Sequence, residues 1–158
     1  MTPSPETPSP SGPRRRVLFL CTGNSARSQI AESLVNHFLG DRWEACSAGT
    51  APAGYVHPLA IQVLREWGVG VASLRSKSVA EVETSAFDLV VTLCDEAREQ
   101  CPLWPGSGQV RHLSFPDPAR AAGTEQERLD AFRQVRNAIW RALKEQLAPA
   151  PSGRGGGP

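Results

Sequence analysis

Apolar positions along this chain follow two spacings. Near-continuous apolar runs, such as 17–20 and 87–93, are typical of strands that are buried on both faces of a sheet. Elsewhere apolar positions recur every three or four residues, which predicts helices with one buried face. The two kinds of segment alternate along most of the chain. This alternation predicts an α/β fold, a four-stranded parallel sheet flanked by helices on both faces.

The boundaries of the predicted elements follow from these patterns and from the turn residues between them. We expect strands at 16–21, 43–48, 87–93 and 109–113. We expect helices at 27–39, 58–67, 78–84, 95–100 and 124–147. Ligands bind at the carboxyl ends of the strands in sheets of this kind.

The two ends of the chain lack the apolar positions that a core needs. Residues 1–13 are mostly Pro, Ser and Thr, and residues 148–158 are mostly Pro, Gly, Ala and Ser. Neither segment buries enough apolar area to offset the entropy lost on ordering it. We therefore expect two disordered tails around a single domain at 14–147, a length that is ordinary for one core.

The charge balance argues against two classes of partner. Seventeen Lys and Arg residues stand against 16 Asp and Glu residues, which leaves no field to attract nucleic acid or an anionic membrane. No stretch approaches the ~20 apolar residues of a membrane span, and residues 1–13 lack the apolar core of a signal peptide. We expect a cytoplasmic monomer with no nucleic-acid or membrane partner.

Four cysteines stand at positions 21, 46, 94 and 101. A reducing compartment disfavours static disulfides and favours catalytic, redox-cycling or metal-binding thiols. No Cys-x-x-Cys pair is present, which argues against a structural zinc site. Cys21, Cys94 and Asp117 follow the first, third and fourth predicted strands, so we expect them to converge at one edge of the sheet. Cys46 lies inside the second predicted strand, and we interpret it as a core residue.

The segment after the first predicted strand has the residues of an anion-binding loop. It runs Cys21-Thr22-Gly23-Asn24-Ser25-Ala26-Arg27-Ser28 and leads directly into a predicted helix. The successive N–H groups of such a loop and the N-terminus of the helix favour negative charge at one spot. The loop is therefore a candidate site for a tetrahedral oxyanion.

Single residues of this loop suit the same chemistry. Arg27 offers a fork that matches two oxygens of a tetrahedral anion, and with the helix dipole it favours the thiolate form of Cys21. Gly23 lets the backbone approach a ligand closely, and Asn24 tolerates a left-handed turn. We expect Ser28 to donate a hydrogen bond to the Cys21 sulfur. The alternative, a buried cysteine that happens to end a strand, leaves the spacing of these residues unexplained.

Cys-x5-Arg-Ser after a first strand, with Gly-Asn inside the loop, resembles the low-molecular-weight protein tyrosine phosphatase family. It also resembles the relatives of that family, the thioredoxin-coupled arsenate reductases. The reductase branch is further indicated by Ser47-Ala48-Gly49, Val90-Val91-Thr92-Leu93-Cys94, Cys101-Pro102 and Asp117-Pro118. The resemblance runs from about residue 16 to residue 143.

The resemblance implies an arsenate reductase that serves arsenic detoxification through a relay of three cysteines. Cys21 would attack arsenate held by Arg27 and the loop amides, and Asp117 would protonate the departing oxygen. Cys94 would then attack Cys21 and release arsenite. Cys101 would next attack Cys94 and leave a Cys94–Cys101 disulfide for thioredoxin. The resemblance implies no metal and no organic cofactor.

Alternatives to these roles stay open from the residues alone. Asp117 precedes a proline, and by spacing it is equally well a surface turn aspartate. Cys94 and Cys101 are alternatively two incidental helix cysteines. If their segment is helical, their α carbons lie ~10.5 Å apart, whereas a disulfide tolerates at most ~7 Å. The segment would then have to unwind to form the bond.

Some family members hold a potassium ion beside the loop with an Asn, a Glu, a Ser and an Asp. Asn24, Glu32 and Ser47 match the first three by position, but Lys77 stands where the Asp would be. A lysine ammonium can supply the positive charge internally, so we expect little activation by potassium. A solvated lysine is the alternative.

Two other functions stay open. A low-molecular-weight tyrosine phosphatase would use only Cys21, Arg27 and Asp117, and a residual phosphatase activity is compatible with the site. However, nothing aromatic follows Asp117 to form a phosphotyrosine slot, and Tyr55 is the only tyrosine. A non-enzymatic redox or oxyanion sensor would need a partner surface, for which the sequence offers no support.

Overall fold

The predicted α/β fold class is confirmed by a computed structural model, which describes residues 14–82, 85–93 and 109–147. Within these residues one parallel sheet has the strand order β2-β1-β3-β4. Its strands are β1 (Arg15–Cys21), β2 (Trp43–Gly49), β3 (Leu89–Thr92) and β4 (Gln109–His112).

The central strand is β1, and its position explains its apolar run. Residues 17–20 have no exposed surface. Leu18 pairs with Cys46 of β2 on one side and with Val90 of β3 on the other. Since both edges of β1 are paired and both its faces are covered, every side chain of the run is buried.

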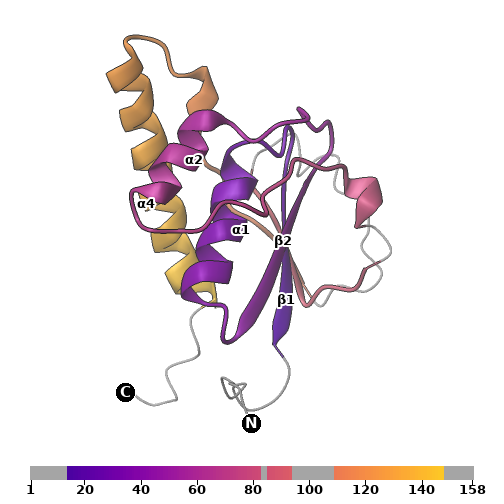
Figure 1. Cartoon of the computed structure of the whole chain (residues 1–158). Coiled ribbons are helices and arrows are strands. Elements are labelled where there is room, and N and C mark those ends of the chain that lie inside the picture. Colours follow the sequence, from indigo (N-terminus) through magenta and orange to yellow (C-terminus); the bar gives the residue numbers. More distant parts are fainter. Residues whose placement is uncertain (1–13, 83–84, 94–108, 148–158) are drawn as a thin grey trace.

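The described helices are α1 (Arg27–Phe38), α2 (Pro58–Arg65) and α4 (Glu125–Leu147), with two short 3₁₀ helices, η1 (Val79–Glu81) and η2 (Pro118–Arg120). Figure 1 shows α1, α2 and α4 on one side of the sheet and η1 on the other. None of the helices in the described part of the chain is long and apolar enough to span a membrane.

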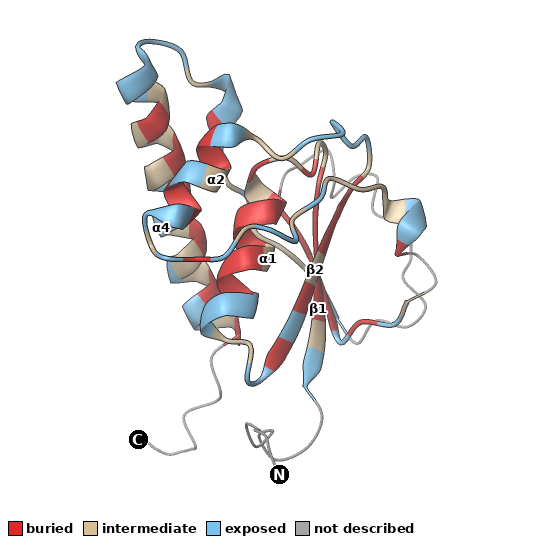
Figure 2. Ribbon diagram, viewed as in Figure 1, coloured by how far each residue is buried: buried red, intermediate tan, exposed pale blue. Residues whose placement is uncertain are grey.

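Helix α1 lies between the sheet and the other two helices. It packs on β1 and β2, and α4 packs on both α1 and α2. Ile30 and Leu34 of α1 and Phe132 of α4 have no exposed surface. Figure 2 shows the buried residues concentrated where α1 and α4 face inward. This core places the N-terminus of α1 directly beyond the carboxyl end of β1.

Two elements differ from their predicted bounds by two residues at one end, for local reasons. The helix expected at 58–67 ends at Arg65, because the chain turns at Gly68, which has a φ of 73°. The strand expected at 87–93 pairs only over Leu89–Thr92. Phe87 is nevertheless buried, and the guanidinium of Arg16 lies 4.8 Å from the centre of its ring. An apolar run therefore indicates which residues are buried, and here the buried segment is longer than the segment that pairs as a strand.

Two short elements also differ. The helix expected at 78–84 is the 3₁₀ helix η1, and residues 83–84 lie outside the described residues. The 3₁₀ helix η2 was not predicted. It begins after Asp117, whose carboxylate accepts a hydrogen bond from the N–H of Ala119 (3.0 Å). The helix expected at 95–100 and both terminal tails lie outside the described residues.

Candidate active site

A cleft of about 500 Å³ opens at the carboxyl ends of the strands. Its walls come from the loop after β1 and from the segment between β4 and η2. The lining residues are Cys21, Thr22, Gly23, Ser25, Ala26, Arg27, Ser114, Phe115, Pro116, Asp117 and Arg120. The expected convergence of Cys21 with Asp117 is therefore confirmed. Cys94 and Cys101 lie outside the described residues.

The carbonyl groups of the loop after β1 accept hydrogen bonds from residues that are not among those lining the cleft. The carbonyls of residues 21, 22, 23 and 25 accept hydrogen bonds of 2.8–3.2 Å from backbone N–H groups of residues 50, 51, 53 and 57. The carbonyl of Asn24 accepts a hydrogen bond from the side-chain amide of Gln29 (2.9 Å). Five consecutive carbonyls thus point toward neighbouring protein.

The orientation of these carbonyls decides where the loop N–H groups point. In a planar trans peptide the N–H of each residue lies opposite the carbonyl of the residue before it. The N–H groups of residues 22–26 therefore point to the cleft side of the loop. Helix α1 begins at Arg27 and adds the positive end of its dipole. This arrangement suits a tetrahedral anion.

The Cys21 thiol is buried at the base of the cleft, with 2% of its surface exposed. Its Sγ lies 2.9 Å from Oγ of Ser28. The Nδ2 group of Asn24 donates a hydrogen bond to the same Oγ (2.7 Å). Since that oxygen already accepts one hydrogen bond, the Ser28 hydroxyl proton is available to the sulfur. Ser28 is therefore placed to donate a hydrogen bond to the Cys21 sulfur.

Asn24 is the centre of a buried polar network. It has no exposed surface and adopts the left-handed conformation, with a φ of 49°. Its Nδ2 also donates to Oγ of Ser47 (3.0 Å), and its Oδ1 accepts the backbone N–H of Lys77 (2.8 Å). These bonds use both donors and the acceptor of the side-chain amide. The network joins the loop to β2 and to the segment before η1.

The network continues to a partly buried charge pair. Ser47 donates to Oε1 of Glu32 (2.5 Å), and Nζ of Lys77 lies 3.8 Å from the same oxygen. Burial raises the pKa of the Glu32 carboxyl, while the Ser47 hydrogen bond and the Lys77 charge oppose this rise. The Lys77 side chain is only 14% exposed. It is therefore not the solvated lysine of the alternative interpretation.

These residues do not fit a potassium ion. The ammonium of Lys77 already brings a positive charge to Glu32, and it also donates to the carbonyl of Arg75 (3.4 Å). A second cation beside it would be repelled. In the described ranges of the chain, no cluster of three or more His, Cys, Asp or Glu side chains is placed to hold a metal.

Arg27 and Asp117 meet across the cleft. Nη1 of Arg27 donates to the carbonyl of Phe115 (3.0 Å), and its Nη2 lies 3.7 Å from Oδ2 of Asp117. The other carboxylate oxygen of Asp117 accepts the N–H of Ala119. The guanidinium thus joins the anion loop to the loop that carries the carboxyl group, and a proton held on Asp117 would lie at the cleft wall.

Four residues of the site were not singled out from the sequence. Gln29 is fully buried and also donates to the carbonyl of Arg75 (2.9 Å). Ser76 donates to the carbonyl of Gly23 (3.2 Å). Phe115 holds Arg27 through its carbonyl, and Arg120 lines the cleft. No local pattern marks the first three, because their partners are far away in the sequence, but the Asp-Pro pair before Arg120 is a helix-start signal.

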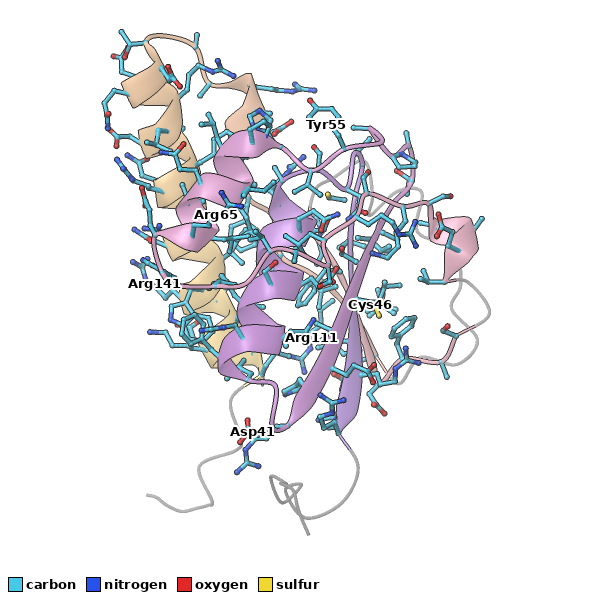
Figure 3. All side chains as sticks on the ribbon, in the orientation of Figure 1. Asp41, Cys46, Tyr55, Arg65, Arg111 and Arg141 are labelled. Atoms are coloured by element: carbon cyan, nitrogen blue, oxygen red, sulfur yellow. The ribbon has the colours of Figure 1, made fainter. Side chains whose placement is uncertain are left out.

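Cys46 is half-buried and packs against the core from β2, as interpreted from the sequence. Figure 3 labels it on the side of the sheet away from α4. Burial raises the pKa of the Cys46 thiol, and the negative charge of Glu32 raises it further. Cys46 therefore favours the neutral thiol form.

The chain is similar to proteins of one family. The model of the low molecular weight phosphotyrosine protein phosphatase family matches residues 16–150. The arsenate reductase of Bacillus subtilis (strain 168) is 42% identical over 129 residues, which cover 82% of this chain and 92% of that protein. The arsenate reductase of Halalkalibacterium halodurans is 40% identical over 131 residues, which cover 83% of this chain and 94% of that protein.

Solved structures show the same similarity. An arsenate reductase in the phosphate binding state matches with a TM-score of 0.73 at 25% identity, and the match covers 85% of this chain and 97% of that chain. A thioredoxin-dependent arsenate reductase of Corynebacterium glutamicum matches with a TM-score of 0.59 at 30% identity. That match covers 85% of this chain and 64% of the other.

Gly49 allows the close approach of the loop to β2, which leads to a first prediction. A Cβ atom at this position would lie 2.6 Å from the carbonyl oxygen of Thr22 and 2.9 Å from Cβ of Asn24. We expect Gly49→Ala to lower the free energy of unfolding by about 1–3 kcal/mol, as overpacking does. We also expect it to weaken the protection against alkylation that bound inorganic phosphate gives to Cys21.

Gly70→Ala is the matched control, because no atom lies within 4 Å of a Cβ at that position. Urea unfolding measures stability, and mass spectrometry of the Cys21 peptide measures protection. Equal protection in the two variants would show that the tight contact at Gly49 does not shape the loop.

Proposed function

This chain is an enzyme of the low molecular weight phosphotyrosine protein phosphatase family, and we propose that it reduces arsenate to arsenite. The observation that carries the proposal is the similarity, at about 40% identity over most of the chain, to proteins named arsenate reductase. The geometry supports it, because a thiol, a guanidinium and a row of N–H groups face one cleft large enough for a tetrahedral anion.

In the first proposed step Cys21 attacks arsenate. The N–H groups of residues 22–26 and Arg27 bind the anion, and Ser28 stabilises the thiolate until the new bond forms. A sulfur–arsenic bond replaces one arsenic–oxygen bond. Asp117 gives its proton to the departing oxygen, which leaves as water. The position of Asp117 supports this role, because its carboxyl group lines the same cleft as Cys21 and lies across from the Arg27 guanidinium that would bind the anion.

The second proposed step transfers electrons through two further thiols. Cys94 attacks the Cys21 sulfur, and the sulfur–arsenic bond breaks with its electron pair left on arsenic. Arsenic(V) becomes arsenic(III), while Cys21 and Cys94 become a disulfide. Cys101 then attacks Cys94 and frees Cys21. Both later cysteines lie outside the described residues, and their roles follow from the family resemblance in the sequence.

Thioredoxin is the proposed reductant of the Cys94–Cys101 disulfide. The support is a structural relative, the thioredoxin-dependent arsenate reductase of Corynebacterium glutamicum. A cytoplasmic location would keep the three thiols reduced between turnovers. Phosphate has nearly the same shape and charge as arsenate, so it should bind in the cleft and compete without being reduced.

Phosphoester hydrolysis would use the same cleft without the later thiols. Among the described residues that line the cleft, Phe115 is the one aromatic side chain. Tyr55 is 55% exposed and is not among them. An aryl phosphate would therefore find little aromatic surface to stack on, which favours a small inorganic anion as the main substrate.

The relay is tested with purified protein, arsenate, thioredoxin, thioredoxin reductase and NADPH, with NADPH oxidation as the readout. We expect Cys21→Ser, Cys94→Ser and Cys101→Ser each to abolish turnover, because each removes one sulfur of the relay. The last two variants should still bind arsenate. Cys46→Ser is the control and should keep its turnover. Turnover that survives in Cys94→Ser or Cys101→Ser would remove that thiol from the mechanism.

The general-acid role is tested with Asp117→Asn, which retains the shape of the side chain but holds no acidic proton. We expect kcat to fall by about 10²–10⁴-fold, the usual contribution of a general acid. Phosphate should still protect Cys21 from alkylation. Asp41→Asn, an exposed position that Figure 3 places at the far end of the molecule, is the control. Near-normal turnover of Asp117→Asn would exclude this residue as the acid.

The role of the Lys77 ammonium in place of a potassium ion is tested by replacing sodium chloride with potassium chloride at constant ionic strength. We expect the turnover of the wild type to change little, because Lys77 supplies the positive charge beside Glu32. Lys77→Asp completes the Asn, Glu, Ser and Asp set and should make turnover depend on potassium. Strong stimulation of the wild type by potassium over sodium would contradict this role of Lys77.

A further inference from the structure

The open side of the cleft carries a second arginine that neither the sequence motif nor the proposed mechanism uses. Arg120 is the last residue of η2 and lines the cleft. Its side chain is 82% exposed, and its Nε lies 3.7 Å from Oδ2 of Asp117. The same oxygen lies 3.7 Å from Nη2 of Arg27. One carboxylate oxygen therefore lies between two guanidinium groups.

The distances and the local backbone show how Arg120 is held there. Both nitrogen–oxygen distances are longer than a hydrogen bond, so each contact is an ion pair without a fixed hydrogen-bond geometry. The other oxygen of Asp117 accepts the N–H of Ala119, which starts the 3₁₀ turn. Because of that turn, the side chain of Arg120 lies beside the carboxylate of Asp117, three residues before it in the sequence.

Arg120 changes the balance of charge among the residues that line the cleft. Among the described lining residues an ionised Asp117 offsets only one of the two arginines, so Arg120 adds a positive charge to the cleft whether or not Asp117 carries its proton. The reaction must bring a doubly charged oxyanion to a thiolate, and these two groups repel each other. A fixed positive charge at the entrance lowers this repulsion and raises the local concentration of the anion.

We propose that Arg120 is a specificity-determining residue that recruits doubly charged inorganic oxyanions to the cleft. This inference deepens the proposed function, because arsenate and phosphate are anions of this class. The identity of the substrate rests on the proposed function. The effect of the Arg120 charge on anions in the cleft can be measured without arsenate reduction. Since Arg120 is exposed, salt screens its charge over a Debye length of about 8 Å at 0.15 M.

The charge effect is measured through alkylation of Cys21 by two reagents of similar size. Iodoacetate is an anion and iodoacetamide is neutral, so the ratio of their rates at Cys21 reports the potential in the cleft. Mass spectrometry of the Cys21 peptide separates this site from the other cysteines. We expect Arg120→Ala to lower the ratio about two- to fivefold at low salt, the range of an exposed ion pair.

Three comparisons make the experiment specific. Arg120→Lys retains the positive charge and should restore most of the ratio. Arg141→Ala removes one exposed positive charge from α4, and the ratio should equal that of the wild type. The difference between Arg120→Ala and the wild type should shrink at 0.5 M sodium chloride.

Kinetics then connect the charge to the substrate. In the thioredoxin assay we expect Arg120→Ala to raise KM for arsenate more than it lowers kcat. If the wild type reduces no arsenate, the proposed function fails, while the alkylation ratio still tests Arg120. An unchanged ratio in Arg120→Ala, or an equal decrease in Arg141→Ala, would overturn the inference.

Discussion

The candidate active site depends on the hydrogen bonds that turn five loop carbonyls away from the cleft. A loop of successive peptides has no intrinsic reason to point its N–H groups at one spot. Here donors from residues 50–57 and from Gln29 occupy the carbonyls of residues 21–25, and planar peptides then direct the N–H groups to the other side. An anion bound as proposed would find these N–H groups already oriented, which is the condition for strong electrostatic stabilisation.

A buried polar network supports this backbone. Asn24 uses its whole side-chain amide, and through Ser47 the hydrogen bonds reach Glu32, which forms an ion pair with the ammonium of Lys77. Buried polar groups are costly unless they are satisfied, so a fully bonded Asn24 gives the loop one preferred conformation. The same network leaves the Ser28 proton to the Cys21 sulfur. Loop shape and thiolate stability therefore have a common origin.

The cleft also shows how one family site can serve two reactions. A thiolate, Arg27 and a carboxyl group are enough to form a covalent adduct with a tetrahedral anion, whether its central atom is phosphorus or arsenic. The fate of that adduct depends on the next nucleophile, because water hydrolyses it and a second thiol reduces it. Among the described lining residues, the single aromatic side chain and the positive charge of Arg120 support the proposal of a small inorganic anion as substrate. The proposed activity thus needs both a site that binds tetrahedral anions and further cysteine thiols that reduce the adduct.

The sequence by itself determined the features that are encoded locally. Apolar spacing predicted every described strand within two residues at each end, and the motif from Cys21 to Ser28 predicted a loop between β1 and α1 at the carboxyl edge of the sheet. Only the tertiary structure decided which groups occupy the loop carbonyls and that Arg27 binds Phe115, which is 88 positions away in the chain. It also showed that the partly buried Lys77 pairs with Glu32 and that Arg120 lines the cleft. Periodicity reports which face of an element is buried, whereas contacts between distant segments arise only when the folded sheet brings their ends together.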